Sequence, residues 1–259
     1  LDNSDGEIEA VGSAIINATS IINDRGRLIV TGPGNLALTS SGNISSIDGL
    51  IGGNGDVSVR AASVNVSGAN GAIVAGRNLA VTSSTIGVDG GAALRAGGDA
   101  LLVATNALTA TAGTIEAGGL LDVDAASATA SGGSLLAGSS LAVDSGSLTN
   151  SASEIIAYGA TGSANIRVTG SLDNQGLLAF NMAGAIVQAG SLSNSGELIH
   201  AGTGQLNLGA TSAFTNSGTV ASNGQLGLTA TSLTNSGSLG IARNITIATS
   251  ELAANSGSI

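Results

Sequence analysis

His200 is the only histidine of the 259-residue chain, and the chain has no cysteine. A histidine that acts as an acid–base catalyst or as a metal ligand normally needs further partner residues close in space. In this chain no second histidine or cysteine can be that partner. His200 also stands two residues after Leu198, at a position that Ala157 and Phe180 occupy in the two preceding units of a repeat. We expect a structural His200, no catalytic residue and no enzymatic activity.

Asp122, Asp124 and Asp144 are the carboxylates whose spacing could serve a cation. Carboxylate oxygens are the ligands that Ca²⁺ prefers, but a surface row of like charges accounts for the same spacing at a cost in repulsion. Both interpretations stay open, and we assign no metal ligand. The segment GGNGD at 52–56 is similar to the calcium-binding nonapeptide G-G-x-G-x-D, but its aspartate comes one residue early and the motif does not recur. It indicates a turn.

The charge balance excludes several classes of partner. The net charge is −10, and the seven basic residues are all arginine. Nucleic acids and anionic lipid surfaces both require a dense basic patch, so we expect neither as a partner.

No apolar run is long enough to span a bilayer, and no glycine-rich run leads into a lysine and a helix, so we expect no membrane insertion and no cofactor. The chain begins at Leu1 without a visible signal peptide, which we interpret as a piece of a longer protein.

One phrase recurs along the whole chain. SLTNSGSL at 232–239 returns as SLSNSGEL at 191–198 and as AFTNSGTV at 213–220. The apolar residues that close the phrase form a series with steps of 19 to 23 residues: Ile8, Leu28, Leu50, Ile73, Leu94, Ile115, Leu135, Ile155, Leu178, Leu198, Val220, Leu239 and Ile259. A fixed period of this size predicts a solenoid, with residues 1–259 as a single repeat domain.

Each repeat contains three short apolar stretches. One is the L-x-N arm, one follows the glycine of the phrase, and one is an alternating pair such as Leu79/Val81, Leu101/Val103 or Leu121/Val123. Alternation over a few residues between Gly, Ser and Asn is typical of strands. We predict an all-β fold: a right-handed parallel β-helix with three short strands per coil and about 12–13 coils of about 20–21 residues. Glycine at 41 positions and only three aromatic residues suit its narrow interior.

The phrase itself predicts a corner of the coil. Asparagine at the end of the arm can hydrogen bond to its own turn, and stacked asparagines can form an amide ladder. We expect the glycine two residues later to adopt positive φ. The predicted corner and ladder residues are Asn150, Asn174, Asn194, Asn216, Asn235, Gly176, Gly196, Gly218 and Gly237. Coils at 1–28 and 147–259 follow this pattern, whereas at 29–146 the asparagine position decays to Ser46, Ala110 and Ala130.

The largest side chains gather around one irregular step. Tyr158, Phe180 and His200, with Met182, lie near the long step between Ile155 and Leu178. They could form a receptor-contact patch, or a place where an inserted bulge makes room for larger core residues. Both interpretations stay open.

The L-x-N-x-G-x-[IL] arm, repeated about every 20 residues, resembles the filamentous haemagglutinin repeats of bacterial two-partner secretion exoproteins. That family includes large adhesins and contact-dependent growth inhibition effectors. The resemblance implies a monomeric β-helical shaft that an outer-membrane transporter of the two-partner secretion type exports to the cell surface or the medium. It implies a structural role in extending and displaying an adhesive or toxin-delivering region. The alternative is an adhesin module whose own face binds a host glycan or a receptor on a host or target cell.

Overall fold

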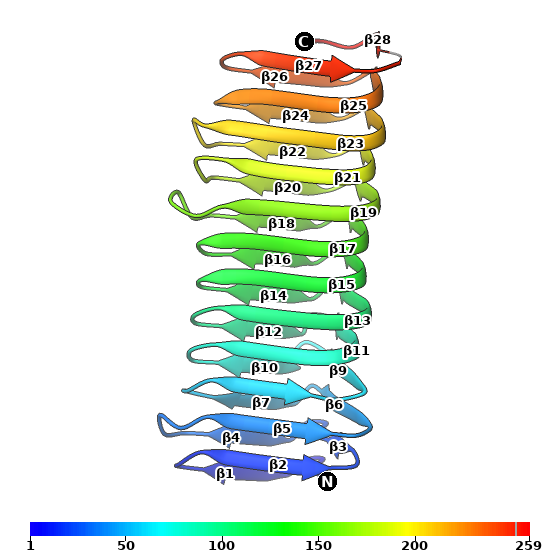
Figure 1. Ribbon diagram of the computed structural model, residues 1–259. Coiled ribbons are helices and arrows are strands. Elements are labelled where there is room, and N and C mark those ends of the chain that lie inside the picture. Colours follow the sequence, from blue (N-terminus) through cyan, green and yellow to red (C-terminus); the bar gives the residue numbers. More distant parts are fainter. Residues whose placement is uncertain (252) are drawn as a thin grey trace.

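The computed structural model describes residues 1–251 and 253–259, and within them it is a rod of stacked parallel strands with no helix (Figure 1). The two ends of the chain lie at opposite ends of the rod, so the chain climbs by one coil per repeat. Each strand pairs in parallel with its equivalent in the coils before and after it. The all-β parallel helix expected from the repeat is confirmed, with about 12 turns.

One side of the rod is a 12-stranded sheet of short strands. Its members, in spatial order, are β1 (Glu7–Ala10), β4 (Arg27–Val30), β7 (Leu50–Gly53), β10 (Ala72–Ala75), β12 (Ala93–Ala96), β14 (Thr114–Ala117), β16 (Ser134–Ala137), β18 (Glu154–Ala157), β20 (Leu177–Phe180), β22 (Glu197–His200), β24 (Thr219–Ser222) and β26 (Ser238–Ile241).

The other sides belong to a 16-stranded sheet. Its main path is β2 (Ala14–Ala18), β5 (Leu36–Ser40), β8 (Val57–Arg60), β11 (Leu79–Asp89), β13 (Ala100–Thr111), β15 (Leu120–Ser131), β17 (Ser140–Ser151), β19 (Ala164–Asn174), β21 (Ala185–Asn194), β23 (Gln205–Asn216), β25 (Gln225–Asn235) and β27 (Ile245–Thr249). The short strands β3 (Ile21–Ile22), β6 (Asn43–Ile47), β9 (Ser63–Ser67) and β28 (Ala253–Asn255) complete it.

Within the described residues, the predicted three strands per coil occur as separate strands in the first three coils and again in the last coil, as β26, β27 and β28. From β11 to β25 the second and third strands merge into one strand of 10 to 12 residues. Several of these long strands shift register at one point, for example between Ser83 and Thr85 and between Ala189 and Leu192. The third corner therefore survives as an irregularity inside a continuous strand, because the hydrogen bonds between coils continue around it.

Leu50 in the predicted closing series and the predicted pair Leu101/Val103 are each shifted by one residue from the buried positions. Ile51, and not Leu50, lies in register between Leu28 and Ile73 and is fully buried. Likewise Ala100 and Leu102 lie in the inner rows, whereas Leu101 is 43% exposed. Both errors arise in runs of adjacent apolar residues, where the two-residue period of a strand has no polar residue to set its phase.

The core consists of rows of small aliphatic side chains that run along the rod axis. A representative row joins Ile73, Leu94, Ile115, Leu135 and Ile155, each in register with the next and each at most 1% exposed. Like side chains stack at the strand spacing of about 4.8 Å. A narrow interior of this kind has room for few aromatic rings, which agrees with the composition.

Candidate functional site

The corner asparagines form a buried amide ladder at one edge of the rod. The Nδ2 atoms of Asn150, Asn174, Asn194 and Asn216 each donate to the Oδ1 of the next asparagine, at 2.6 to 2.8 Å. These four side chains are at most 1% exposed. Asn235 continues the ladder to Asn255, which is exposed at the end of the rod, at 2.7 Å.

The second proton of each amide is also used. Asn174 Nδ2 donates to the backbone oxygen of Glu197 at 3.0 Å, and Asn194 Nδ2 donates to that of Thr219 at 3.1 Å. At the first rung the hydroxyl of Ser153 lies 2.5 Å from Asn150 Oδ1 and 2.8 Å from the oxygen of Ala130. A buried amide with all its groups paired stabilises a fold, whereas an unpaired one is costly. The ladder thus joins successive coils at this corner with fully paired amides.

A shorter piece of the same ladder lies at the other end of the rod. Asn3 Nδ2 donates to Asn23 Oδ1 at 2.7 Å, and Asn23 Nδ2 reaches Ser46 Oγ at 3.4 Å. Between the two pieces the row is filled by Val66, Val88, Ala110 and Ala130. This part of the row is apolar and has no amide ladder, which matches the decay of the sequence phrase at 29–146.

The predicted positive φ at the corner glycines is wrong. Gly176, Gly196, Gly218 and Gly237 have φ values outside the left-handed region. The reason for glycine is a close approach between coils: a Cβ at Gly218 would lie 2.1 Å from the carbonyl oxygen of Gly196, and one at Gly196 would lie 2.2 Å from that of Gly176. Each corner glycine therefore leaves room for the backbone of the coil before it.

Left-handed residues do occur, at the corners of the earlier coils. One stands two residues after the ladder position in each of these coils: Asp5, Arg25, Asp48, Gly68, Gly90, Ala112, Gly132 and Ala152. Gly91, next to Gly90, is also left-handed. From Asn174 onward the corner is one residue shorter. Asn150 stands five positions before Ile155, the first buried residue of the next short strand, whereas Asn174 stands only four positions before the equivalent Leu178. The shorter corner needs no left-handed residue, but it brings the glycine against the neighbouring coil.

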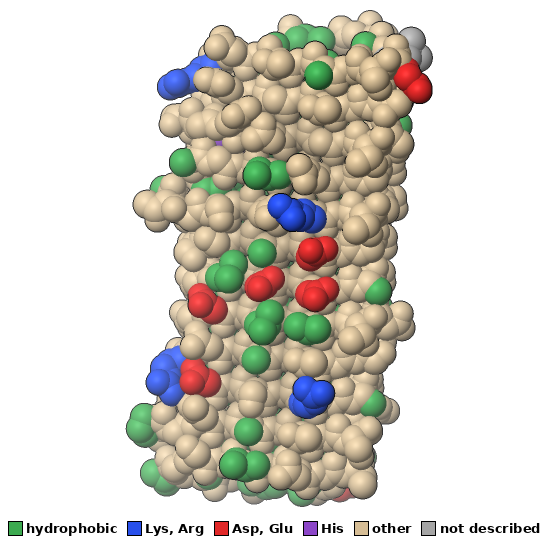
Figure 2. All heavy atoms as spheres, in the orientation of Figure 1, with side chains coloured by type: hydrophobic (Ala, Val, Ile, Leu, Met, Phe, Trp, Pro, Cys, Tyr) green, Lys and Arg blue, Asp and Glu red, His purple; other side chains and the backbone are tan. Residues whose placement is uncertain are grey.

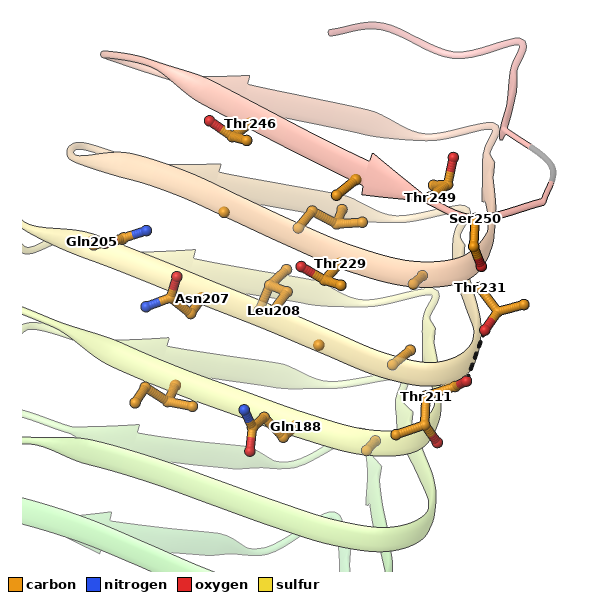
Figure 3. A pocket seen from close by; sticks show the side chains of 18 residues that line it. Gln188, Gln205, Asn207, Leu208, Thr211, Thr229, Thr231, Thr246, Thr249 and Ser250 are labelled. Carbon is orange, nitrogen blue, oxygen red and sulfur yellow. Dashed lines mark hydrogen bonds between the residues drawn. The ribbon is translucent and has the colours of Figure 1, made fainter.

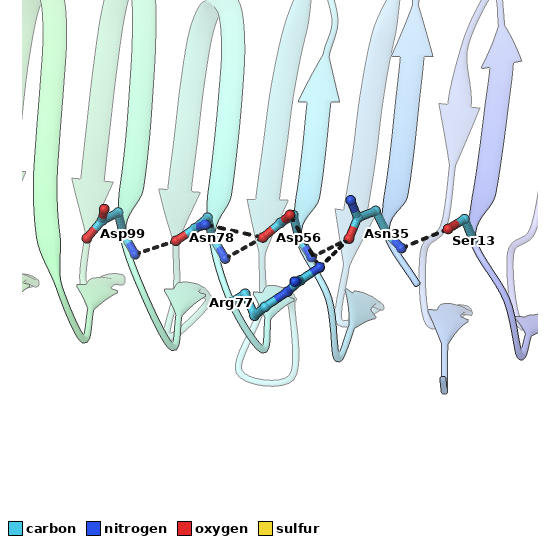
Figure 4. Close-up of polar contacts among 6 residues, drawn as sticks. All are labelled: Ser13, Asn35, Asp56, Arg77, Asn78 and Asp99. Carbon is cyan, nitrogen blue, oxygen red and sulfur yellow. Dashed lines mark hydrogen bonds and ion pairs between the residues drawn. The ribbon is translucent and has the colours of Figure 1, made fainter. Parts of the chain in front are cut away.

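A second ladder, not predicted from the sequence, runs along another corner (Figure 4). The backbone N–H of Asp56 donates to Asn35 Oδ1 at 3.0 Å, that of Asn78 to Asp56 Oδ1 at 3.2 Å, and that of Asp99 to Asn78 Oδ1 at 3.0 Å. Arg77 lies beside this row, with Nη2 2.8 Å from Asn35 Oδ1. The available signal was an Asn or Asp immediately before each alternating apolar pair, as in GNLAL and GDVSV. The GGNGD segment supplies Asp56 to this ladder, so it is a corner as expected.

Phe180 and His200 are buried at 1% exposure, and Met182 is fully buried, whereas Tyr158 is 52% exposed. Ala157, Phe180, His200 and Ser222 follow one another in register as one inner row. The structure therefore does not join Tyr158, Phe180 and His200 into a surface patch. Tyr158 instead begins the β18–β19 connection, which projects from the rod (Figure 1).

The imidazole of His200 is held inside the rod by two hydrogen bonds. Its Nε2 lies 2.9 Å from the backbone oxygen of Met182, and its Nδ1 lies 3.0 Å from the hydroxyl of Ser222. Because a carbonyl can only accept, Nε2 carries the proton and Nδ1 accepts from Ser222. With both nitrogens occupied by the protein, His200 has no free group for chemistry.

The three aspartates lie on the flat outer face of β15 and β17, where Figure 2 shows acidic side chains grouped together. Asp124 is in register with Asp144, and Arg167 follows Asp144 in the next coil. Burial raises the pKa of the Asp122 carboxyl, and the charges of Asp124 and Asp144 raise it further. Over the described residues, no three His, Asp or Glu side chains come together as a group that could hold a metal ion.

These features define the class of protein: a parallel β-solenoid in which two ladders of side-chain hydrogen bonds link successive coils. The haemagglutinin repeat family model matches the chain at residues 1–47, 48–112, 96–176, 145–207 and 201–259. The chain therefore belongs to the haemagglutinin repeat family, as its corner phrase indicated. No curated protein and no solved structure matches it. In the part of the chain that the structure describes, no helix could cross a membrane.

Proposed function

We propose that the chain is a shaft segment of a secreted or cell-surface bacterial exoprotein, and that it extends and displays an adhesive or toxin-delivering region. The observation that carries the proposal is that every coil from Asn150 to Asn235 makes the same amide contact with the next coil. A structure that repeats one contact along one axis gains length with each coil. Export through an outer-membrane transporter of the two-partner secretion type, and action outside the cell, are part of this proposal.

An in-register deletion tests the proposal in the full-length exoprotein. Removing residues 175–216 joins Asn174 to Ser217 and recreates the corner Asn-Ser-Gly with two coils fewer. The rod should shorten by about 10 Å, measured by small-angle scattering, with secretion and display of a downstream epitope retained. A control deletion of residues 175–205 joins Asn174 directly to Leu206 near the start of β23, with no short strand between them, and should abolish folding and secretion.

The same deletion distinguishes a shaft from an adhesin. A shaft tolerates the loss of whole coils without loss of attachment to target cells. If the in-register variant is displayed normally but no longer attaches, the coils themselves carry the binding function and the shaft proposal fails.

A further inference from the structure

The outer face of the short-strand sheet carries an apolar row of side chains. Alternate residues of each short strand point away from the core, and one row of them runs in register along the rod. In coil order this row, called the stripe below, is Ile29, Gly52, Val74, Arg95, Glu116, Leu136, Ile156, Ala179, Ile199 and Ala221. Its aliphatic side chains are all partly exposed. A contiguous exposed apolar surface of this kind marks a place where another molecule binds.

The long-strand sheet has a different outer face. Over β21, β23, β25 and β27 its outward rows carry polar side chains such as Gln188, Asn207 and Thr229, with gaps at Gly209 and Gly227 (Figure 3). Polar outward side chains are the normal composition of a sheet face that water covers. In these coils a continuous apolar row occurs on the short-strand side of the rod and not on the long-strand side.

Two charged residues divide the stripe. The Nε of Arg95 lies 3.4 Å from Glu116 Oε2, and both side chains are well exposed. On one side of this pair the stripe continues through Val74, Gly52 and Ile29, and on the other side through Leu136, Ile156 and Ala179. A row with opposite charges at its centre and apolar residues on both sides is complementary to the same row in the reverse direction.

We propose that the stripe binds a second copy of this chain, face to face and antiparallel, about a two-fold axis that passes between Arg95 and Glu116 along the strand direction. Arg95 then lies opposite the partner's Glu116, and Glu116 lies opposite the partner's Arg95. The four charges alternate in sign around the axis, so each guanidinium group has two carboxylates beside it. Complementary charges of this kind fix the register of an interface more than they add affinity.

The apolar residues on either side of the axis also match in size. The axis places Val74 opposite the partner's Leu136, Gly52 opposite the partner's Ile156, and Ile29 opposite the partner's Ala179. Sheets that pack face to face stand about 10 Å apart, so opposed side chains share a limited volume. At Gly52 and at Ala179 a small residue leaves that volume to the large residue opposite.

Other arrangements of the same two faces bring unfavourable pairs together. If the two rods ran parallel, each stripe would face the second outward row, so Ile156 would lie opposite the partner's Glu154 and Ile199 opposite the partner's Glu197. An antiparallel pair centred on Ala179 instead places Glu154 opposite the partner's Glu197. Burial of a carboxylate against an apolar side chain or against another carboxylate is costly.

The proposed axis also suits the charges at the rim of the stripe. It places Arg27 opposite the partner's Leu177, and therefore between the partner's Glu154 and the partner's Glu197. Glu7 comes opposite the partner's Glu197, but Arg27 lies beside both carboxylates, with its Nη1 already 2.8 Å from Glu7 Oε1. The basic end of one stripe thus meets the acidic end of the other.

The contact is small. Ten coils at the usual strand spacing and four residues of strand give a footprint of about 40 Å by 13 Å, or roughly 500 Å² on each rod. Stable complexes bury about 800 Å² on each partner, so we expect a reversible pair with a Kd of about 10–100 μM. The pair goes beyond the monomeric shaft that the family resemblance implies, and it does not depend on the display function proposed above.

Charge reversal at the axis tests the proposal in the chain of residues 1–259. Arg95→Glu makes all four charges at the axis negative, and Glu116→Arg makes all four positive. The double variant Arg95→Glu/Glu116→Arg restores the alternation, and it also keeps an ion pair within each chain. Arg60→Glu is the matched control, because it makes the same charge change on the other sheet, in β8. Thermal unfolding should give all four variants melting temperatures close to that of the parent, since exposed ion pairs contribute little to stability.

Sedimentation equilibrium then measures the pairing. We expect each single reversal at the axis to weaken dimer formation at least tenfold, and we expect the double variant and Arg60→Glu to pair as the parent does. The proposal is overturned if the parent stays monomeric up to about 1 mM. It is also overturned if a folded single reversal pairs as well as the parent, or if the double variant does not recover.

A distance measurement tests the register itself. The chain has no cysteine, so Thr219→Cys carries a single spin label, at an outward position beyond the proposed contact. Two labels on an antiparallel pair about the proposed axis lie 11 coil spacings apart, or about 50 Å, in pulsed electron paramagnetic resonance. A parallel pair, or one centred on Ala179, gives about 25 Å or less, and either distance would refute the proposed axis.

Discussion

Asn194 Nδ2 lies 2.7 Å from Asn216 Oδ1, and both side chains are almost completely buried although 22 residues separate them in the chain. This one contact joins two successive coils at the corner where the chain turns. Replacement of Asn194 by alanine leaves the Oδ1 of Asn216 and the backbone oxygen of Thr219 without that donor. We expect Asn194→Ala to lower the free energy of unfolding by about 1–3 kcal/mol in urea titrations. Asn106→Ala, which removes an exposed amide, is the control, and equal midpoints for the two variants would disprove a role for the ladder in stability.

The corner glycines should be intolerant of the smallest side chain. Gly218→Ala places a Cβ 2.1 Å from the carbonyl oxygen of Gly196, so the two coils must move apart. We expect a loss of about 2 kcal/mol or more, or failure to fold, measured by circular dichroism and thermal unfolding. Gly240→Ala is the matched control because no atom lies within 4 Å of the added Cβ. Similar melting temperatures for the two alanine variants would refute the close-approach explanation.

Asp122 should make stability depend on pH. Its pKa in the folded protein is raised by burial and by its acidic neighbours, so the ionised carboxylate destabilises the fold. That group's contribution to stability is complete below its ordinary pKa of 3.8 and is lost as the pH rises through the raised value. Asp122→Asn should therefore stabilise the rod by about 0.5 kcal/mol at neutral pH, and the gain should vanish at about pH 3. Chemical unfolding of both proteins across this pH range tests the sign, with Glu154→Gln as the surface control.

The second ladder, through Asn35, Asp56, Asn78 and Asp99, should contribute less to stability than the buried amide ladder. Asn78 Oδ1 accepts from the backbone N–H of Asp99, but the residue is exposed and water can replace the lost oxygen. Leucine already occupies the equivalent place at Leu120, so the rod tolerates that side chain. We expect Asn78→Leu to cost about 0.5–1 kcal/mol in thermal unfolding. A loss of stability as large as that of Asn194→Ala would contradict the smaller contribution expected of the second ladder.

The fold could be predicted because the same sequence pattern recurs in every coil. Twelve imperfect copies of one pattern reveal the strands, the corners and the buried asparagines, even where one copy such as Leu101/Val103 misleads. Relations between neighbouring coils were harder to predict. The role of Gly196 depends on a carbonyl 20 residues earlier, and the burial of Phe180 and His200 depends on the row they share. The gaps that Gly209 and Gly227 leave in two outward rows of side chains could not be predicted, because the two glycines look like any other glycine until the rows are aligned.

The amide ladder also has a direction. Every Nδ2 from Asn150 to Asn235 donates toward the C-terminal side, and every Oδ1 from Asn174 to Asn255 accepts from the N-terminal side. A cut between any two of these coils therefore exposes an amide donor on one face and an amide acceptor on the other. Two such faces are complementary to each other and not to themselves. Contact between cut ends is then heterologous and head-to-tail, so the symmetry of the rod is that of a polar filament and excludes a two-fold axis across its length.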